Sequence, residues 1–286
     1  MSAETWQLDT ASTYSVPVGW YAAVGVPARA NVVLMAALGV AAGFYRKFAA
    51  DLAGRGFNVA LMEQRGHGDS ALRPSRRQDW GFAEVLDEDL PATLERVREK
   101  APQLPLLLMG HSLGGHYAAI YAGLHAAQID GVVMIATGSP WWRAFQGRTR
   151  RLVHQLTYLI PVAGLLLGYY PGERIGFGGR EARTLMLDWR DLARSNRYSA
   201  RGSRQDLEAG IAEYAGPVLA VRFADDPFAP QAAVEAVTGK FARADLVQRV
   251  LDAGQLGDKA DHFRWARQAS AVGQIVDDWQ REKYHE

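Results

Sequence analysis

Residues 104–124 have the sequence LPLLLMGHSLGGHYAAIYAGL, and this stretch decides the fold class. Its first part is apolar at almost every position, which is typical of a strand buried on both faces of a sheet. A glycine-rich turn follows, and after it the residues are mostly small and apolar, as in a helix packed closely on a sheet. A buried strand followed at once by a buried helix favours a parallel sheet covered by helices, the α/β class.

The same alternation of strands and helices continues on both sides of this stretch. Apolar runs bounded by glycine and proline indicate strands, and apolar residues at helical spacing indicate helices. Strands are predicted at residues 5–8, 16–23, 31–37, 57–62, 104–110, 131–138, 217–223 and 245–251, and helices at 44–52, 79–100 with a kink at Pro91, 113–127, 231–241 and 263–282.

The alternation breaks between Trp141 and Glu208, where arginine and aromatic residues are frequent and no strand is predicted. An irregular helical insertion between two halves of one sheet explains this better than two sequential domains. We therefore expect an α/β core of residues 1–140 and 209–286, with a helical cap inserted at residues 141–208.

The longest apolar stretch of the chain, residues 156–170, lies inside this insertion and is interrupted by Pro161 and Gly164. It is shorter than the ~20 residues that span a bilayer. The sequence predicts a helical hairpin or cap segment here and no stable insertion into a membrane.

The composition excludes several function classes. With 32 Lys+Arg against 31 Asp+Glu, the net charge is +1, so no overall field attracts nucleic acid or an anionic membrane. The absence of cysteine excludes disulfides, thiolate zinc sites and cysteine nucleophiles. The first twelve residues, MSAETWQLDTAS, contain no apolar run, so we expect no signal peptide and a cytoplasmic location.

The turn after the strand 104–110 matches the pattern G-x-S-x-G, with Ser112 at its centre. The flanking glycines let strand and helix approach closely, and the tight turn lifts the serine hydroxyl above the sheet. The Leu113 N–H then lies at a helix N-terminus, where the positive end of the helix dipole stabilises an oxyanion. The alternative is a purely structural turn, because short glycine–serine patterns recur by chance.

A serine nucleophile needs a base and an acid that orients the base. In this arrangement the acid follows the serine in the chain and leaves the sheet after a later strand. Asp225 and Asp226 follow the predicted strand 217–223. Asp226 is favoured because it directly precedes the Pro-x-x-Pro turn that opens the next helix, although either aspartate could serve only as a turn residue.

His262 is the candidate base. Of the seven histidines, it is the only one between Asp226 and the C-terminal tail that contains His285. It lies at the head of the last predicted helix. The alternative is an ordinary surface histidine at a helix start.

A second oxyanion donor is expected in the loop after the strand 31–37, where the chain continues Leu38-Gly39-Val40. A backbone N–H does not depend on the side chain that it belongs to. We therefore assign Leu38 as the candidate donor.

These motifs resemble those of serine hydrolases with the α/β-hydrolase fold, and the similarity extends over nearly the whole chain. In detail the chain is similar to a bacterial group of predicted α/β hydrolases with a helical cap. Two positions depart from the pattern: Glu63 stands where aspartate is usual, and the oxyanion loop lacks His-Gly. The matching segments are 44–48, 63–70, 110–115, 225–230 and 262–265, with 169–172 and 176–178 in the cap.

The resemblance implies a mechanism. Ser112 attacks an acyl carbonyl, His262 takes and returns the proton, and Asp226 fixes the imidazole. The N–H groups of Leu38 and Leu113 hold the oxyanion. The resemblance implies a small-molecule acyl substrate, an ester, a thioester or less readily an amide, and no cofactor or metal. An acyltransferase with the same triad and a noncatalytic ligand-binding protein remain as alternatives, and the sequence does not indicate the oligomeric state.

The insertion offers two further hypotheses. Its residues 141–208 hold 12 Arg, no Lys and 6 Asp+Glu, an excess that could steer an anionic substrate or could be a solvated face. Its aromatic residues could line an acyl pocket or could form the core of the cap. The pocket candidates are Trp141, Trp142, Tyr158 and Tyr169, together with Leu165 and Leu166.

Overall fold

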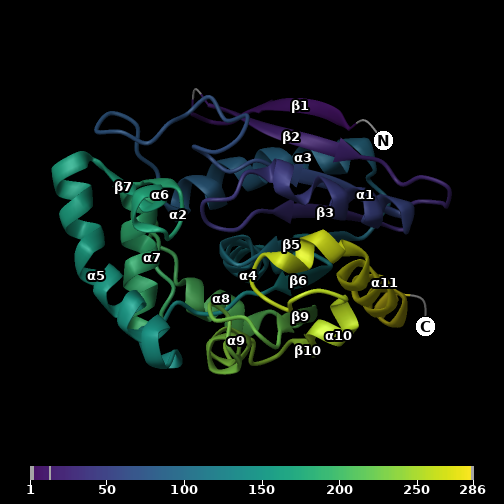
Figure 1. Ribbon diagram of the computed structural model, residues 1–286. Coiled ribbons are helices and arrows are strands. Elements are labelled where there is room, and N and C mark those ends of the chain that lie inside the picture. The colour runs from purple at the N-terminus through teal and green to yellow at the C-terminus, as the bar shows by residue number, and fades with distance from the viewer. Residues whose placement is uncertain (1–2, 13, 285–286) are drawn as a thin grey trace.

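The computed structural model describes residues 3–12 and 14–284, and its centre is an eight-stranded sheet in the order β1-β2-β4-β3-β5-β6-β9-β10 (Figure 1). β2 pairs antiparallel with β1 and with β4, and all other neighbours are parallel. The strands are β1 (Glu4–Asp9), β2 (Ser15–Tyr21), β3 (Ala30–Met35), β4 (Phe57–Met62), β5 (Leu106–His111), β6 (Gly131–Ile135), β9 (Pro217–Phe223) and β10 (Asp245–Leu251).

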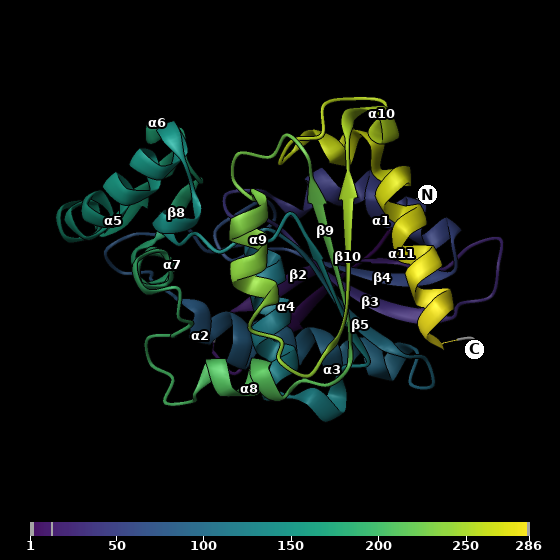
Figure 2. The same cartoon turned by 90° about the horizontal axis from the view of Figure 1, so that it is seen from below.

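Helices cover both faces of this sheet (Figure 2). On β3 every residue is buried, and successive side chains point to opposite faces. Val32 and Leu34 pack in one apolar cluster with α1 and α11, whereas Val33 and Met35 pack in the other with α3 and α4. This confirms the predicted α/β class with a mostly parallel sheet. The helices of the core are α1 (Arg46–Gly54), α2 (Phe82–Glu84), α3 (Leu90–Lys100), α4 (Leu113–Leu124), α8 (Leu207–Glu213), α9 (Gln231–Thr238), α10 (Ala253–Leu256) and α11 (Ala269–Tyr284).

The predicted helix 79–100 is observed as a continuous helical segment over residues 82–100, but its middle is irregular. A π-helical turn, Val85–Asp89, joins α2 to α3, and within it the Leu90 N–H bonds the Val85 carbonyl five residues earlier. Pro91 follows this turn directly, in the first turn of α3. The buried Asp89 carboxylate receives three hydrogen bonds of 2.7–3.0 Å from the Arg65 guanidinium, which ties this irregular turn to the loop after β4.

Residues 136–216 lie between β6 and β9, and we call them the inserted segment. They extend to one side of the sheet (Figures 1 and 2) before α8 returns to pack on α4. The sequence analysis expected no strand here, but β7 and β8 form a small antiparallel pair. Strands of three residues are too short to show an alternating pattern. The elements outside the core are α5 (Gly147–Leu167), β7 (Tyr169–Pro171), α6 (Gly172–Ile175), β8 (Arg180–Ala182) and α7 (Arg183–Ser195).

A helical hairpin or cap segment was expected at residues 156–170; residues 156–167 are the second half of one continuous helix, α5, which passes through Pro161, and Tyr169 and Tyr170 begin β7. A proline inside a helix leaves the carbonyl four residues earlier without its usual donor. Here that carbonyl belongs to Thr157, and it accepts a hydrogen bond of 2.7 Å from Arg190 Nε on α7. The neighbouring helix therefore replaces the lost bond. None of the helices in the described part of the chain is long and apolar enough to cross a membrane.

Candidate active site

Ser112 occupies a strained turn between β5 and α4. Its φ of 53° and ψ of −112° lie in a region that side-chain-bearing residues rarely adopt. A Cβ on Gly110 would overlap the Gly114 backbone, and a Cβ on Gly114 would overlap the backbone of Met35 on β3. The two glycines of G-x-S-x-G are therefore both required by close backbone contacts at this turn.

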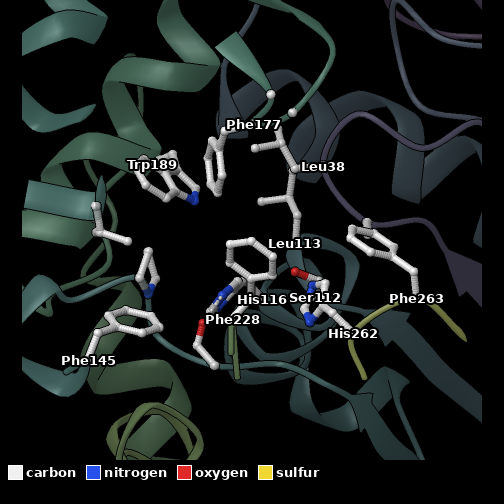
Figure 3. Close-up of a pocket in the computed structure, with 16 residues that line it drawn as sticks. Leu38, Ser112, Leu113, His116, Phe145, Phe177, Trp189, Phe228, His262 and Phe263 are labelled. Carbon is white, nitrogen blue, oxygen red and sulfur yellow. Dashed lines mark hydrogen bonds between the residues drawn. The ribbon is translucent and has the colours of Figure 1, made fainter. Parts of the chain in front are cut away.

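Two backbone N–H groups are available beside Ser112. Leu113 is the first residue of α4, so its N–H lies at the positive end of the helix dipole. Leu38 lies in a turn closed by a 3.0 Å hydrogen bond from the Val40 N–H to the Ala37 carbonyl. Neither the Leu38 nor the Leu113 N–H makes a hydrogen bond within the described residues, and both residues line the same cavity as Ser112 (Figure 3).

His262 forms a 2.7 Å hydrogen bond through Nδ1 with Asp226 Oδ2. Both side chains are buried, and the other carboxylate oxygen of Asp226 accepts hydrogen bonds from the N–H groups of Phe228 and Ala229. Asp225 is exposed. Figure 3 shows the His262 ring beside the Ser112 side chain, and the Nδ1 contact leaves Nε2 free to face the serine. The geometry thus places Asp226, not Asp225, against His262. His285 lies outside the described residues.

The His111 ring is held in place by Tyr45. The Tyr45 hydroxyl accepts a 3.0 Å hydrogen bond from the Ala37 N–H and shares a 2.7 Å hydrogen bond with His111 Nδ1. The remaining nitrogen, Nε2, is buried and has no hydrogen-bond partner within the described residues, so a single ring nitrogen orients His111. Burial lowers the pKa of His111 well below its ordinary value, so the ring is neutral.

The cavity above Ser112 has a volume of about 130 Å³ and is mainly apolar (Figure 3). Its wall is formed by loops of the sheet core, such as those at Leu38 and His262, and by residues of the inserted segment. No arginine lines it, so the arginine excess of the inserted segment does not act inside the cavity. The aromatic residues of the wall are Phe145, Phe177, Trp189, Phe228 and Phe263.

The structure corrects the predicted pocket residues, because Trp141, Trp142, Tyr158 and Tyr169 do not line this cavity. Tyr158 is 56% exposed, since it lies on the outer face of α5. The Trp142 ring lies against His154 at a tilt of 41°, and Tyr169 stacks under the Arg180 guanidinium at 4.0 Å. The presence of aromatic residues in a sequence does not show whether they lie on the inner or the outer face of a helix. The glycine-rich loop at residues 176–179 is a sequence feature that could have drawn attention to Phe177, whereas no feature of the sequence marks Trp189.

His116 forms a polar part of the cavity wall that the sequence analysis did not assign. Its Nδ1 lies 2.5 Å from the Tyr198 hydroxyl, and its Nε2 lies 3.2 Å from the Gly138 carbonyl. A carbonyl only accepts, so Nε2 carries the proton and Tyr198 donates to Nδ1. Burial lowers the pKa of His116 to about 4, so this wall is uncharged at neutral pH.

The loop of the inserted segment lies directly on the Leu38 turn. Gly39, at φ +76°, touches the backbone of Gly178 and Gly179 so closely that a Cβ would overlap them. Beside this contact, His67 Nε2 lies 3.1 Å from the buried Glu181 carboxylate of β8. Burial alone lowers the pKa of His67, but the hydrogen bond and charge of Glu181 outweigh it and raise the pKa overall.

Glu63, a departure from the usual aspartate, has a structural role. Its Oε1 accepts a 2.8 Å hydrogen bond from the Ala42 N–H, in the turn that precedes α1. Among residues 3–12 and 14–284, no group of three or more His, Asp and Glu side chains could hold a metal ion.

A family model described as serine aminopeptidase, S33, matches residues 26–171, slightly more than half of the chain. The chain belongs to this family. The match includes β3, β4, β5 and the Ser112 turn, and it identifies the protein as a hydrolase of the α/β-hydrolase fold. Membership of the S33 family does not fix which bond is cleaved.

Solved structures support the same fold for this S33 family member. A thermostable carboxyl esterase from Bacillus coagulans is 16% identical, with 99% of each chain covered and a TM-score of 0.68. Est1E from Butyrivibrio proteoclasticus, bound to ferulic acid, is 16% identical over 98% of this chain and 100% of its own, with a TM-score of 0.64. A thioesterase domain from the curacin biosynthetic pathway is 16% identical over 96% and 99%, with a TM-score of 0.62. No curated protein sequence matches the chain.

Proposed function

We propose that the protein is a serine hydrolase that cleaves an ester or thioester bond of a small, uncharged acyl substrate. The observation that carries this proposal is a strained serine that shares one cavity with a histidine, itself hydrogen-bonded to a buried aspartate. Structural neighbours that are an esterase and a thioesterase domain support the same reaction class.

The mechanism follows from the placement of these groups. Ser112 Oγ attacks the acyl carbon while His262 Nε2 takes its proton, and Asp226 stabilises the imidazolium. The oxyanion accepts hydrogen bonds from the free N–H groups of Leu38 and Leu113. His262 returns the proton to the departing alcohol or thiol, and a water molecule then attacks the acyl-enzyme and releases the acid.

The cavity argues for a small acyl group without charge. Its volume of about 130 Å³ is close to that of an apolar protein cavity of ~150 Å³ that holds one benzene ring. His116 is neutral, and no arginine lines the wall. A short acyl chain or a single ring therefore fits, and an anionic group beside the scissile bond finds no partner.

Residues 141–208 act in this proposal as a cap that closes the cavity from water. Phe145, Phe177 and Trp189 come from this part of the chain and form the wall opposite Ser112. Without them the site would open to solvent, and polar interactions with the oxyanion would weaken.

The test is a panel of p-nitrophenyl esters and acyl-CoAs of increasing acyl length, with Ser112→Ala as the control. We expect esters of two to six carbons to exceed the twelve-carbon ester in kcat/KM by roughly tenfold or more. A preference for the longest chains would contradict the small cavity. If an added alcohol receives the acyl group faster than water does, the protein is an acyltransferase instead.

A further inference from the structure

The outer face of α5 exposes a cluster of large apolar side chains. Six of the eleven exposed large hydrophobic side chains in the described part of the chain lie between residues 158 and 167. Exposed apolar side chains are normal on a surface when they are scattered singly, but a cluster of this kind is not. Five of them share one side of the helix, an arc of about 120° at 3.6 residues per turn. We call this cluster the α5 patch: Tyr158, Leu159, Val162, Leu165 and Leu166, each 40–76% exposed.

The inner face of the same helix already completes the packing of the inserted segment. Leu156, Ile160 and Ala163 are buried against the cap core, and Val153 reaches the cavity above Ser112. The apolar side chains of the patch are therefore not needed to hold α5 in place. Figures 1 and 2 both show α5 as the outermost element, on the side of the molecule opposite α11.

Exposed arginines surround the α5 patch. By helical spacing, Arg148 and Arg151 lie on the same side of α5, in its first turns. The Arg194 guanidinium lies 5.8 Å from the centre of the Tyr158 ring, and Arg76 donates to the Leu166 carbonyl. None of these four arginines has a carboxylate within ion-pair distance among the described residues. The patch is thus an apolar centre with an unpaired cationic rim.

We propose that the α5 patch docks the protein on the surface of an anionic lipid bilayer. The leucines and Val162 would enter the boundary between headgroups and acyl chains, and the arginines would pair with lipid phosphates. This is peripheral docking, which needs no membrane-spanning helix. The charge argues against a second copy as the occupant, because a symmetric dimer through this face would bring the two sets of arginines together.

Docking through the α5 patch would bring the cavity close to acyl compounds dissolved in the lipid. α5 carries the patch on one face and a residue of the cavity wall, Val153, on the other. The docking itself does not rest on the proposed hydrolysis, so binding can be measured without a substrate.

The experiment is cosedimentation of the full chain with vesicles of phosphatidylcholine alone or with 30% phosphatidylglycerol. We expect binding to the anionic vesicles and a decrease at high salt, because salt screens the arginine–phosphate attraction. Replacing two leucines, in Leu165→Ser/Leu166→Ser, should lower the partition coefficient at least tenfold. Arg148→Gln/Arg151→Gln should lower it roughly 25-fold, at about fivefold per arginine.

The matched control is Val24→Ser/Val26→Ser, which changes two valines that are 46% and 48% exposed far from α5 in the chain. This variant should bind vesicles like the wild type. Leu165→Ser alone, at a side chain that is 76% exposed, should still weaken binding and is safe for folding.

Three results would overturn the proposal. One is no binding to anionic vesicles, and another is equal binding to vesicles of phosphatidylcholine alone. The third is a light-scattering mass of twice 31.4 kDa that returns to 31.4 kDa in the leucine double variant, because the patch would then be an interface between copies.

Discussion

The Tyr45 hydroxyl connects the two turns that carry the proposed oxyanion donors. It accepts from the N–H of Ala37, the residue before Leu38, and shares a hydrogen bond with Nδ1 of His111, the residue before Ser112. The side chain of Tyr45 is fully buried, so these hydrogen bonds do not compete with water. Tyr45 therefore fixes the position of the Leu38 turn relative to the Ser112 turn.

Tyr45→Phe should lower kcat/KM on a short ester by about tenfold and leave the fold intact. The lost hydroxyl leaves the buried Ala37 N–H without an acceptor, which costs about 1–3 kcal/mol of unfolding free energy. Urea denaturation and steady-state kinetics measure the two effects.

The matched control is Tyr117→Phe. Tyr117 is as deeply buried as Tyr45, but its hydroxyl has no hydrogen-bond partner within the described residues. Its removal should change neither stability nor activity appreciably. Equal effects of the two variants would show that Tyr45 contributes only packing.

The two adjacent aspartates should differ sharply in their effect on turnover. Asp226→Asn should lower kcat by about a thousandfold or more, because an asparagine cannot stabilise the imidazolium of His262 and favours the wrong tautomer. Asp225→Asn should leave kcat within about twofold, since surface substitutions away from a site have little effect. The reverse order in a kinetic comparison would move the acid to Asp225.

Gly39→Ala tests the contact between the inserted segment and the Leu38 turn. A methyl group there would meet the backbone of Gly178 and Gly179, so we expect the Leu38 N–H to shift and kcat/KM to fall at least tenfold. Gly25→Ala is the control, because Gly25 has nearly the same φ, +77°, but nothing within 4 Å of the added methyl.

Gly25→Ala should cost about 1 kcal/mol of stability through backbone strain and leave kcat/KM unchanged. If both glycine variants lose activity equally, strain anywhere in the chain explains the loss. The contact with the inserted segment would then have no special role.

The His67–Glu181 pair predicts a pH-dependent contribution to stability. Three charged groups influence His67: Glu181 on β8, Glu63 after β4 and the opposing Arg73. Its folded pKa is raised above the ordinary 6.5, so its contribution is fully present below pH 6.5 and is lost as the pH rises through the folded pKa.

Urea denaturation at pH 6, 7, 8 and 9 measures this effect. The difference in unfolding free energy between the wild type and His67→Gln should be largest at pH 6 and should shrink towards pH 9. In a Glu181→Gln background, the same substitution should show a smaller dependence on pH. A difference that grows with pH would contradict the raised pKa.

The sequence predicted the sheet well because its strands are buried on both faces. Continuous apolar runs such as residues 57–62 and 217–223 have few alternatives to a central strand, and the structure has strands at both. The turn at Ser112 was also predictable, since steric contacts permit only glycine at Gly110 and Gly114. The order of the chain then brought Asp226 and His262 to the same edge of the sheet.

The inserted segment was less predictable because its structure depends on tertiary contacts. Where α5 passes through Pro161, Arg190 from α7 supplies a hydrogen bond to the Thr157 carbonyl, which local sequence does not reveal. The aromatic residues predicted for the pocket do not line the cavity, for a related reason. Tyr158 lies on α5 and Trp189 lies on α7. The packing of these two helices directs Trp189 towards the cavity and leaves Tyr158 exposed, and the sequence alone does not reveal this packing.

The central claim is that Ser112 is the nucleophile, and covalent labelling tests it most directly. The wild-type protein is incubated with a fluorophosphonate probe, and the labelled peptide is identified by mass spectrometry alongside that of Ser112→Ala. We expect one label per chain, on Ser112, and no label on the variant, whose circular dichroism should match the wild type. Equal labelling of the variant, or a label on a different residue, would contradict the account.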